Sequence, residues 1–146
     1  MATTTLTLAM TSDVTSNPID ISVSMAATTD GSTGVTETSG LARKLIGTGN
    51  TVLFDISADP VSLIDKKAIL YIKNCDGTFT DYVDLKIGDV SGANHAETLR
   101  IYGGQFAVLP LRSTTNIDAS SGTDGDVNVI AATSNTLIEY ALFYEA

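Results

Sequence analysis

The sequence lacks most of the residues on which catalytic and disulfide-rich proteins depend. Its 146 residues include no Trp, one Cys (Cys75), one His (His95) and three Pro. A single Cys cannot form an internal disulfide, and one His with one Cys cannot supply the four ligands of a zinc site. Acid–base catalysis by His would have to use His95, which we interpret as a surface loop residue in a polar break between strands. The sequence therefore predicts a protein that is not an enzyme.

Basic residues are also scarce. The chain holds 8 Lys and Arg against 17 Asp and Glu, a formal net charge of −9. Residues 1–73 contribute −2 (5 basic, 7 acidic) and residues 74–146 contribute −7 (3 basic, 10 acidic). No nucleic-acid partner is expected, because affinity for phosphates comes from clustered Lys and Arg. The charge favours solubility and repulsion between copies, with docking on a basic protein surface as the alternative.

Long apolar runs are missing as well. No stretch approaches the ~20 apolar residues that a membrane-spanning helix needs, so no membrane partner is expected. The segment Met1–Leu8 has neither a positive charge nor a long apolar run, which argues against a secretory signal peptide. We therefore expect synthesis in a cytoplasm.

What the sequence has is a series of short segments in which apolar and polar residues alternate. Frequent Thr, β-branched and aromatic residues are typical of strands with one solvated face. In residues 82–88, Val83, Leu85 and Ile87 are expected to face inward and Asp84 and Lys86 outward. Residues 41–46 fit a helix as well as a strand, and the strand is favoured because the segment is too short for a stable helix. Candidate strands lie near residues 3–10, 19–25, 41–46, 50–56, 68–74, 82–88, 99–102, 106–111, 127–131 and 137–144.

These segments predict an all-β fold: a two-sheet antiparallel sandwich, jelly-roll-like, with eight or nine strands in one domain over residues 1–146. Residues 1–16 are a possible N-terminal arm, and residues 28–40 are a possible mobile loop. In residues 19–25 the apolar side chains, Ile19, Ile21, Val23 and Met25, are expected to face inward.

Turn residues predict how the strands are joined. Asp76-Gly77 is a typical hairpin turn, and Ser134-Asn135 is expected to close a second hairpin between the last two strands. Gly103-Gly104 predicts a bulge or a corner. Pro110 has no N–H to donate to a sheet, which favours an edge strand or a strand end.

No catalytic, cofactor-binding or metal site is predicted. The Asp124-Gly125-Asp126-Val127-Asn128 segment places three oxygen-bearing side chains at a spacing of two, a fragment of a calcium loop without its later Glu. Turn chemistry explains this segment, and cation binding at residues 124–128 stays open. Gly47-Thr48-Gly49 lacks the rest of a phosphate-binding motif. Cys75 lies beside a turn with Lys73 as its basic neighbour, and we interpret it as a bystander thiol.

Five segments carry a resemblance to a known group of proteins: Ile69–Asn74, Val83–Gly88, Leu99–Leu111, Val127–Ala132 and Leu137–Glu145. This series resembles a group of small β-sandwich virion proteins of tailed bacteriophages. The resemblance covers residues 41–146, and the N-terminal forty residues are outside it. It implies a capsid decoration (cement) protein that is made in the host cytoplasm, binds the major capsid protein on the head surface and forms a homotrimer, with no cofactor.

A receptor- or glycan-binding module of a tail or head fibre is the alternative function. Its recognition surface would be the loops at residues 31–40 and 120–126 together with the Tyr side chains, although most Tyr are expected at the edge of the core. The five Tyr are Tyr71, Tyr82, Tyr102, Tyr140 and Tyr144.

Overall fold

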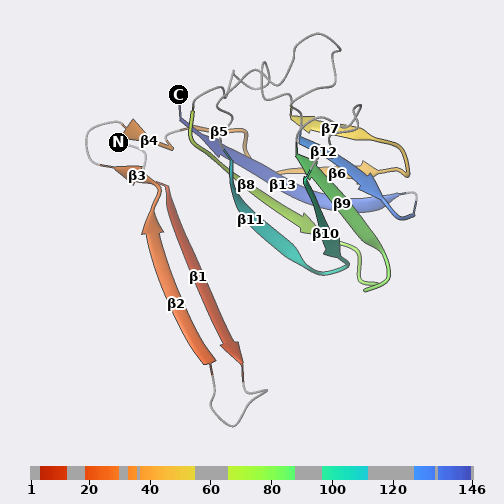
Figure 1. The fold of residues 1–146 in the computed structure, drawn as a ribbon, viewed down its shortest axis with the longest axis horizontal. Coiled ribbons are helices and arrows are strands. Elements are labelled where there is room, and N and C mark those ends of the chain that lie inside the picture. The colour runs from red at the N-terminus through yellow and green to blue at the C-terminus, as the bar shows by residue number, and fades with distance from the viewer. Residues whose placement is uncertain are drawn as a thin grey trace.

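The structure, a computed structural model, describes residues 4–12, 19–29, 33–35, 37–54, 66–87, 97–111, 127–133 and 135–145. These residues form strands and turns, and they contain no helix, hence none that could cross a membrane. Figure 1 shows two parts, a β-sandwich and a long two-stranded hairpin that projects from it. The predicted all-β antiparallel sandwich is confirmed.

The described residues contain thirteen strands, more than the eight or nine predicted. The three two-residue strands were not predicted, whereas both strands of the projecting hairpin were. The hairpin is β1 (Thr5–Ser12) and β2 (Ile19–Ala26), followed by the short β3 (Thr28–Thr29) and β4 (Thr33–Gly34). The sandwich is built from β5 (Glu37–Thr38), β6 (Ala42–Ile46), β7 (Thr51–Phe54), β8 (Ala68–Asn74), β9 (Tyr82–Ile87), β10 (Glu97–Tyr102), β11 (Phe106–Leu111), β12 (Val127–Ala131) and β13 (Thr136–Tyr144).

The order of the sandwich strands is that of a jelly roll. One sheet runs β11-β8-β13, with both β6 and β5 paired along the far side of β13, and the other runs β10-β9-β12-β7. All the pairs are antiparallel. From β6 onward, consecutive strands lie in opposite sheets, except for the paired strands β9 and β10. We call the two layers the five-stranded sheet and the four-stranded sheet.

This topology corrects two predicted hairpins. The turn at Asp76-Gly77 joins β8 to β9, and Asn135 lies in the connection from β12 to β13, but each connection passes from one sheet to the other. A short turn can span the roughly 10 Å between packed sheets, so turn residues alone do not show which strands pair. Gly103-Gly104 is a corner, as predicted, and leads from β10 to β11. Pro110 lies on β11, an edge strand, also as predicted.

Alternation along the strands fills the space between the sheets. Leu70 and Ile72 of β8 are fully buried, as are Val83 and Leu85 of β9. The outward residues Asp84 and Lys86 are half-buried, which confirms the predicted faces of that segment. Complete burial of such a side chain contributes about 1.5–3 kcal/mol. The other buried apolar residues in this cluster include Ile46, Leu53, Phe54, Ala68, Ile101, Val127, Val129, Ala131, Ile138 and Leu142.

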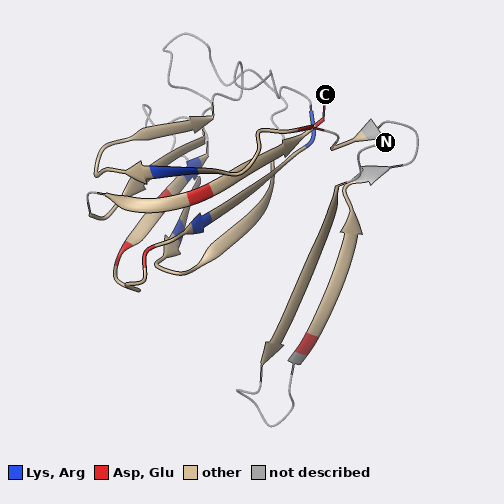
Figure 2. Cartoon of the chain, turned by 180° about the vertical axis from the view of Figure 1, so that it is seen from behind, with Lys and Arg blue, Asp and Glu red and all other residues tan. Residues whose placement is uncertain are grey.

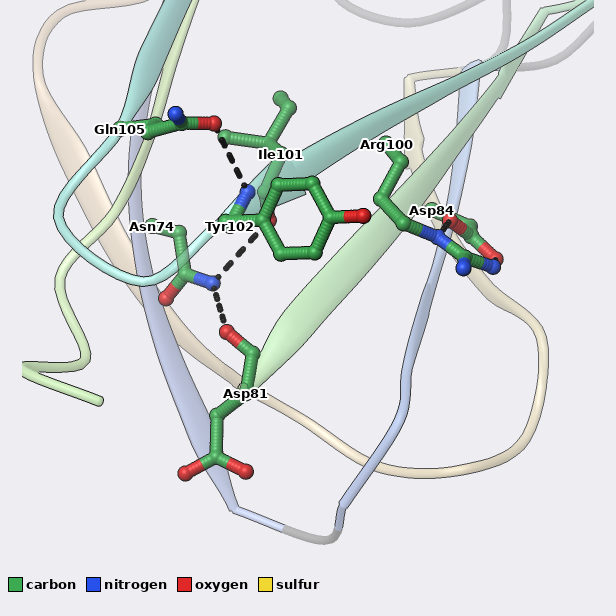
Figure 3. A network of polar contacts seen from close by, with 7 residues as sticks. All are labelled: Asn74, Asp81, Asp84, Arg100, Ile101, Tyr102 and Gln105. Atoms are coloured by element: carbon green, nitrogen blue, oxygen red, sulfur yellow. Dashed lines mark hydrogen bonds and ion pairs between the residues drawn. The ribbon is translucent and has the colours of Figure 1, made fainter. Parts of the chain in front are cut away.

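One buried polar side chain joins the two sheets. Asn74, at the end of β8, is 0 % exposed. Its amide nitrogen donates hydrogen bonds to the carbonyl oxygens of Asp81 (2.8 Å) and Ile101 (3.2 Å), which belong to the β9 and β10 side of the sandwich. Its Oδ1 accepts a hydrogen bond from the N–H of Asp76 at 3.0 Å. Figure 3 shows the two bonds to the carbonyl oxygens beneath the β10–β11 corner.

Candidate functional site

The hairpin β1–β2, which we call the arm, has one apolar face and one polar face. Its register places Leu6 opposite Met25, Leu8 opposite Val23 and Met10 opposite Ile21. The intervening positions on both strands are Thr, Ser, Ala and Asp20. Both predicted strands are therefore confirmed, and they pair with each other.

The apolar face of the arm is exposed. Leu8 is 50 % exposed, Val23 55 % and Met25 49 %, and Met10 and Ile21 are also exposed. The expectation that Ile21, Val23 and Met25 face a core is therefore wrong. The physical reason is that, among the described residues, β1 and β2 form a separate two-stranded sheet that projects away from the sandwich (Figure 1).

A short segment anchors the base of the arm to the five-stranded sheet. The N–H of Ala27 donates to the carbonyl of Thr4 at 2.9 Å, which closes the base of the hairpin. Further along, β5 pairs with the end of β13, and Ser39 exchanges two hydrogen bonds with Leu142 at 2.8 and 2.9 Å. The predicted loop at residues 28–40 thus contains three short strands, of which β5 extends the sandwich.

Where the arm leaves the sandwich, the outer face of the five-stranded sheet forms a groove of about 450 Å³. Leu6 contributes to it from the arm, so the arm and the sheet share this surface. None of its described lining residues is charged, and most are apolar. We call it the apolar groove; it is lined by Thr4, Leu6, Thr38, Gly40, Leu41, Ile69, Tyr71, Val108, Ala141 and Phe143.

Beyond the groove, the same outer face carries further exposed apolar side chains. Leu45 and Phe106 are 60 % and 58 % exposed, and Leu41, which lines the groove, is 66 % exposed. The outer face of a solvated sheet usually carries polar residues. Phe106 lies in one cross-strand row with Lys73, Glu139 and Arg43, so it is separated from Leu41 and Leu45 by charged side chains.

A polar network lies beside the groove. Arg43 donates to Oε2 of Glu139 from Nε (2.9 Å) and pairs with it through Nη2 (2.8 Å), and the Tyr71 hydroxyl donates to Oε1 at 3.2 Å. The hydrogen bond from Arg43 is the main cause that lowers the pKa of Glu139. Burial, followed by the hydrogen bond to Glu139, raises the pKa of Tyr71. Through Tyr71, which lines the groove, the network connects the apolar groove to the charged pair of Arg43 and Glu139.

We expect the stability contribution of Glu139 to depend on pH. Because its folded-state pKa is lowered, the contribution is fully present above the ordinary carboxyl pKa of ~4.3 and is lost as the pH falls through the folded-state value. Glu139→Gln should therefore be less stable than the unsubstituted protein at pH 7, with the difference shrinking below about pH 4. Urea titrations at pH 7 and below about pH 4 measure the difference in free energy of unfolding between the variant and the unsubstituted protein. Glu37→Gln, on exposed β5, is the control. A difference that is constant with pH would contradict the prediction.

The outer face of the four-stranded sheet carries a second cluster. Arg100 makes two hydrogen bonds to the carboxylate of Asp84, at 2.8 and 2.9 Å, and its guanidinium carbon lies 3.6 Å from the ring centre of Tyr82. The hydrogen bond to Asp84 is the main cause that raises the pKa of Arg100. The exposed ring of Phe79 stacks on Tyr102 with the ring centres 4.7 Å apart. This cluster offers aromatic surface beside charged groups.

The positions considered in the sequence do not meet at one site. His95, Asp124 and Asp126 lie outside the described residues. Asn128 is buried, and its Oδ1 accepts a hydrogen bond from Asn50 at 3.1 Å. Cys75 is a half-buried free thiol. The described part of the chain contains no group of three or more metal-ligating side chains.

The five Tyr residues are also dispersed. Tyr140 and Tyr144 pack against the core, as expected for core-edge residues, and Tyr71 borders the apolar groove. Tyr82 and Tyr102 lie at an edge-on angle to each other on the four-stranded sheet. A single surface made of all five Tyr is therefore excluded.

Sequence reasoning named residues 1–16 as a possible N-terminal arm but expected residues 19–25 to face a core, and it missed the groove as a site. The alternation in residues 3–10 and 19–25 was the available signal, and it correctly separated the apolar face from the Thr- and Ser-rich face. The near-absence of charge in the two strands was a second signal. Asp20 is the one charged residue among the described residues of the arm (Figure 2). Chemically, this site can bind an apolar protein surface.

Comparison with known proteins gives a fold likeness. The chain matches no protein-family model. It also matches no curated protein sequence. Among solved structures it is similar to one from work on Bacillus endospore appendages, described as a novel family of disulfide-linked pili. The TM-score is 0.52 at 14 % identity, over 74 % of this chain and 82 % of the other, so the two chains share a fold.

Proposed function

We propose that this chain is a structural subunit that assembles with other proteins, and that its setting is the head surface of a tailed bacteriophage. The observation that carries the proposal is the arm, whose apolar face projects from the sandwich into solvent. An apolar face of this extent is stable in water when another protein covers it. Assembly is therefore the role that the arm supports best.

Two further observations support this setting. The strand series of residues 41–146 resembles virion structural proteins, for which capsid decoration is the implied role. The solved structure with a similar fold comes from a family of pili, so the fold also occurs in assembled particles. In this proposal the partner is the major capsid protein, and the copies form a homotrimer. The net charge of −9 limits unspecific association between free copies.

Binding to capsids tests the proposal directly. Purified protein mixed with expanded empty phage capsids should co-sediment with them at saturating stoichiometry and raise their disruption temperature. Capsids that have not expanded are tested in parallel, so that binding specific to the expanded lattice is distinguished from binding to any capsid surface. Absence of binding, together with an unchanged disruption temperature, would refute the capsid setting.

A receptor- or glycan-binding module is the second candidate, and the Phe79–Tyr102 stack favours it. Exposed aromatic rings beside Arg100 and Asp84 are the kind of surface on which a sugar ring can stack. Binding on a glycan array that disappears in Phe79→Ala, without any binding to capsids, would select this function over decoration.

A further inference from the structure

The arm and the apolar groove are two uncovered apolar surfaces on the same chain. The arm presents Leu8 and Met10 from β1 and Ile21, Val23 and Met25 from β2, all exposed. The groove presents Ile69, Val108 and Phe143 from three strands of the five-stranded sheet. One surface is a two-stranded sheet with an apolar face, and the other is the outer face of a sheet. Two such faces pack at about 10 Å, as the two layers of a sandwich do.

Charge favours contact between these two surfaces. Each copy carries a net charge of −9, so two copies repel each other over most of their surface. The described residues of the arm include one charged side chain, Asp20, and the groove includes none among its described lining residues. Both surfaces can therefore meet with little electrostatic cost.

Size indicates how many contacts each copy makes. Strands of eight residues are roughly 27 Å long, and a two-stranded face is about 10 Å wide, so one arm covers roughly 270 Å². Stable interfaces bury at least about 600 Å² on each partner. A single arm contact falls well short of this minimum, so a stable assembly requires each copy to give one arm and receive another, which doubles the area buried on the copy and holds it by two contacts at once.

We propose that the apolar face of the arm of one copy packs on the apolar groove of a second copy of this chain, with each copy giving one arm and receiving one. Such a head-to-tail contact closes into a ring when the rotation between neighbouring copies permits it, and otherwise continues as an open filament of identical contacts. The inference rests on the proposed role as an assembly subunit and names the partner of the arm. The homotrimer of the proposed function is one ring of this type, and the contact with the capsid is then made by other surfaces.

Four substitutions in the full-length chain test the exchange. Val23→Lys places a charge on the apolar face of the arm, and Ser22→Lys places the same charge on the opposite face of the same strand. Val108→Lys places a charge in the groove, and Val52→Lys makes the identical change at an exposed position on the four-stranded sheet. Each of the four substitutions adds one positive charge and reduces the magnitude of the net negative charge, from −9 to −8. Greater repulsion between copies therefore cannot explain a loss of association.

Molecular mass in solution, from sedimentation velocity over a range of concentrations, is the measurement. We expect the unsubstituted chain, Ser22→Lys and Val52→Lys to be oligomers. Val23→Lys and Val108→Lys should dissociate with a constant at least about tenfold higher. Circular dichroism should show that Val23→Lys keeps its strand content, because Val23 lies outside the sandwich core. A monomeric unsubstituted chain at tens of micromolar, or oligomers that resist both substitutions, would overturn the proposal.

A mixing experiment identifies the two surfaces as partners. Val23→Lys has a defective arm and an intact groove, whereas Val108→Lys has the reverse. Their equimolar mixture should form a heterodimer through one intact contact, weaker than the unsubstituted oligomer and stronger than either variant alone. Because one contact alone is weak, the mixture and each variant are compared at equal total protein concentration, up to the highest that sedimentation allows. A mixture that associates no more than either variant alone would overturn packing of the arm on the groove. Capsid binding is measured in a separate experiment. If the protein forms oligomers through the arm and the groove but does not bind capsids, the proposed location on a phage head is rejected and the proposed contact between copies is not.

Discussion

Gly103→Ala is expected to lower the free energy of unfolding by about 3 kcal/mol. An added Cβ would lie 2.1 Å from the carbonyl oxygen of Thr78, 2.7 Å from its carbonyl carbon and 3.0 Å from the carbonyl oxygen of Asp76. All three are backbone atoms, so no side-chain rotation can relieve the contact. The Thr78 oxygen also accepts a hydrogen bond from the N–H of Asp81 at 3.0 Å, which a shift of this turn would break.

Thermal and urea unfolding measure this effect. A loss of about 3 kcal/mol corresponds to a fall in Tm of roughly 10 °C for a domain of this size. Gly77→Ala is the matched control, because its added Cβ would meet nothing within 4 Å and its φ is not positive. We expect the control to change stability by less than about 0.5 kcal/mol. If Gly103→Ala and Gly77→Ala changed stability equally, the prediction would be contradicted. Glycine at position 103 would then not be required by the contact between the β10–β11 corner and the turn after β8.

Asn74→Ala is also expected to lower the free energy of unfolding by about 3 kcal/mol. The substitution removes three hydrogen bonds, to the oxygens of Asp81 and Ile101 and from the N–H of Asp76. Each such bond contributes about 1 kcal/mol net, and the unpaired groups left in a buried place add to the loss. Because Asn74 joins the two sheets, its loss should destabilise the sandwich as a whole. Gln105→Ala is the control, since this exposed side chain accepts one long hydrogen bond, 3.3 Å, from Tyr102 (Figure 3).

Asn74→Asp separates the hydrogen bonds from simple loss of volume. The substitution keeps the shape but points an oxygen, in place of the donating nitrogen, at two carbonyl oxygens (Figure 3). Burial and this repulsion should raise the pKa of the introduced carboxyl in the folded state. The variant should therefore lose stability, relative to Asn74→Ala, as the pH rises from about 4 to 7. Urea titrations of both variants across this range check the sign, and a pH-independent difference would contradict it.

Local pattern was a good guide to the strands and to their faces. In β8 and β9, alternation separated buried Leu70 and Val83 from outward Tyr71 and Asp84 because successive side chains of a strand point to opposite faces. Pro110 correctly indicated an edge strand. The corner at Gly103-Gly104 was also predicted, whereas the backbone of the Thr78 turn that makes glycine necessary there belongs to another part of the chain.

The connections and the site depended on contacts between distant segments. Asp76-Gly77 has the residues of a hairpin turn, yet β8 finds its partners in β11 and β13. A turn constrains a few backbone angles, while pairing is decided by which strands can complete the sheet. The Arg43–Glu139 pair is similar, since β6 brings together residues 96 positions apart in the sequence.

For this protein, sequence by itself determined an all-β chain, the positions of its strands, the inward and outward faces of the sandwich strands and a strongly acidic surface. Tertiary structure decided which sheet each strand joins and whether each apolar face is covered. Val83 and Val23 occur in equally regular alternating segments, but Val83 is fully buried and Val23 is more than half exposed. The physical reason is that alternation gives a strand an apolar face, and burial of that face requires a second surface packed against it.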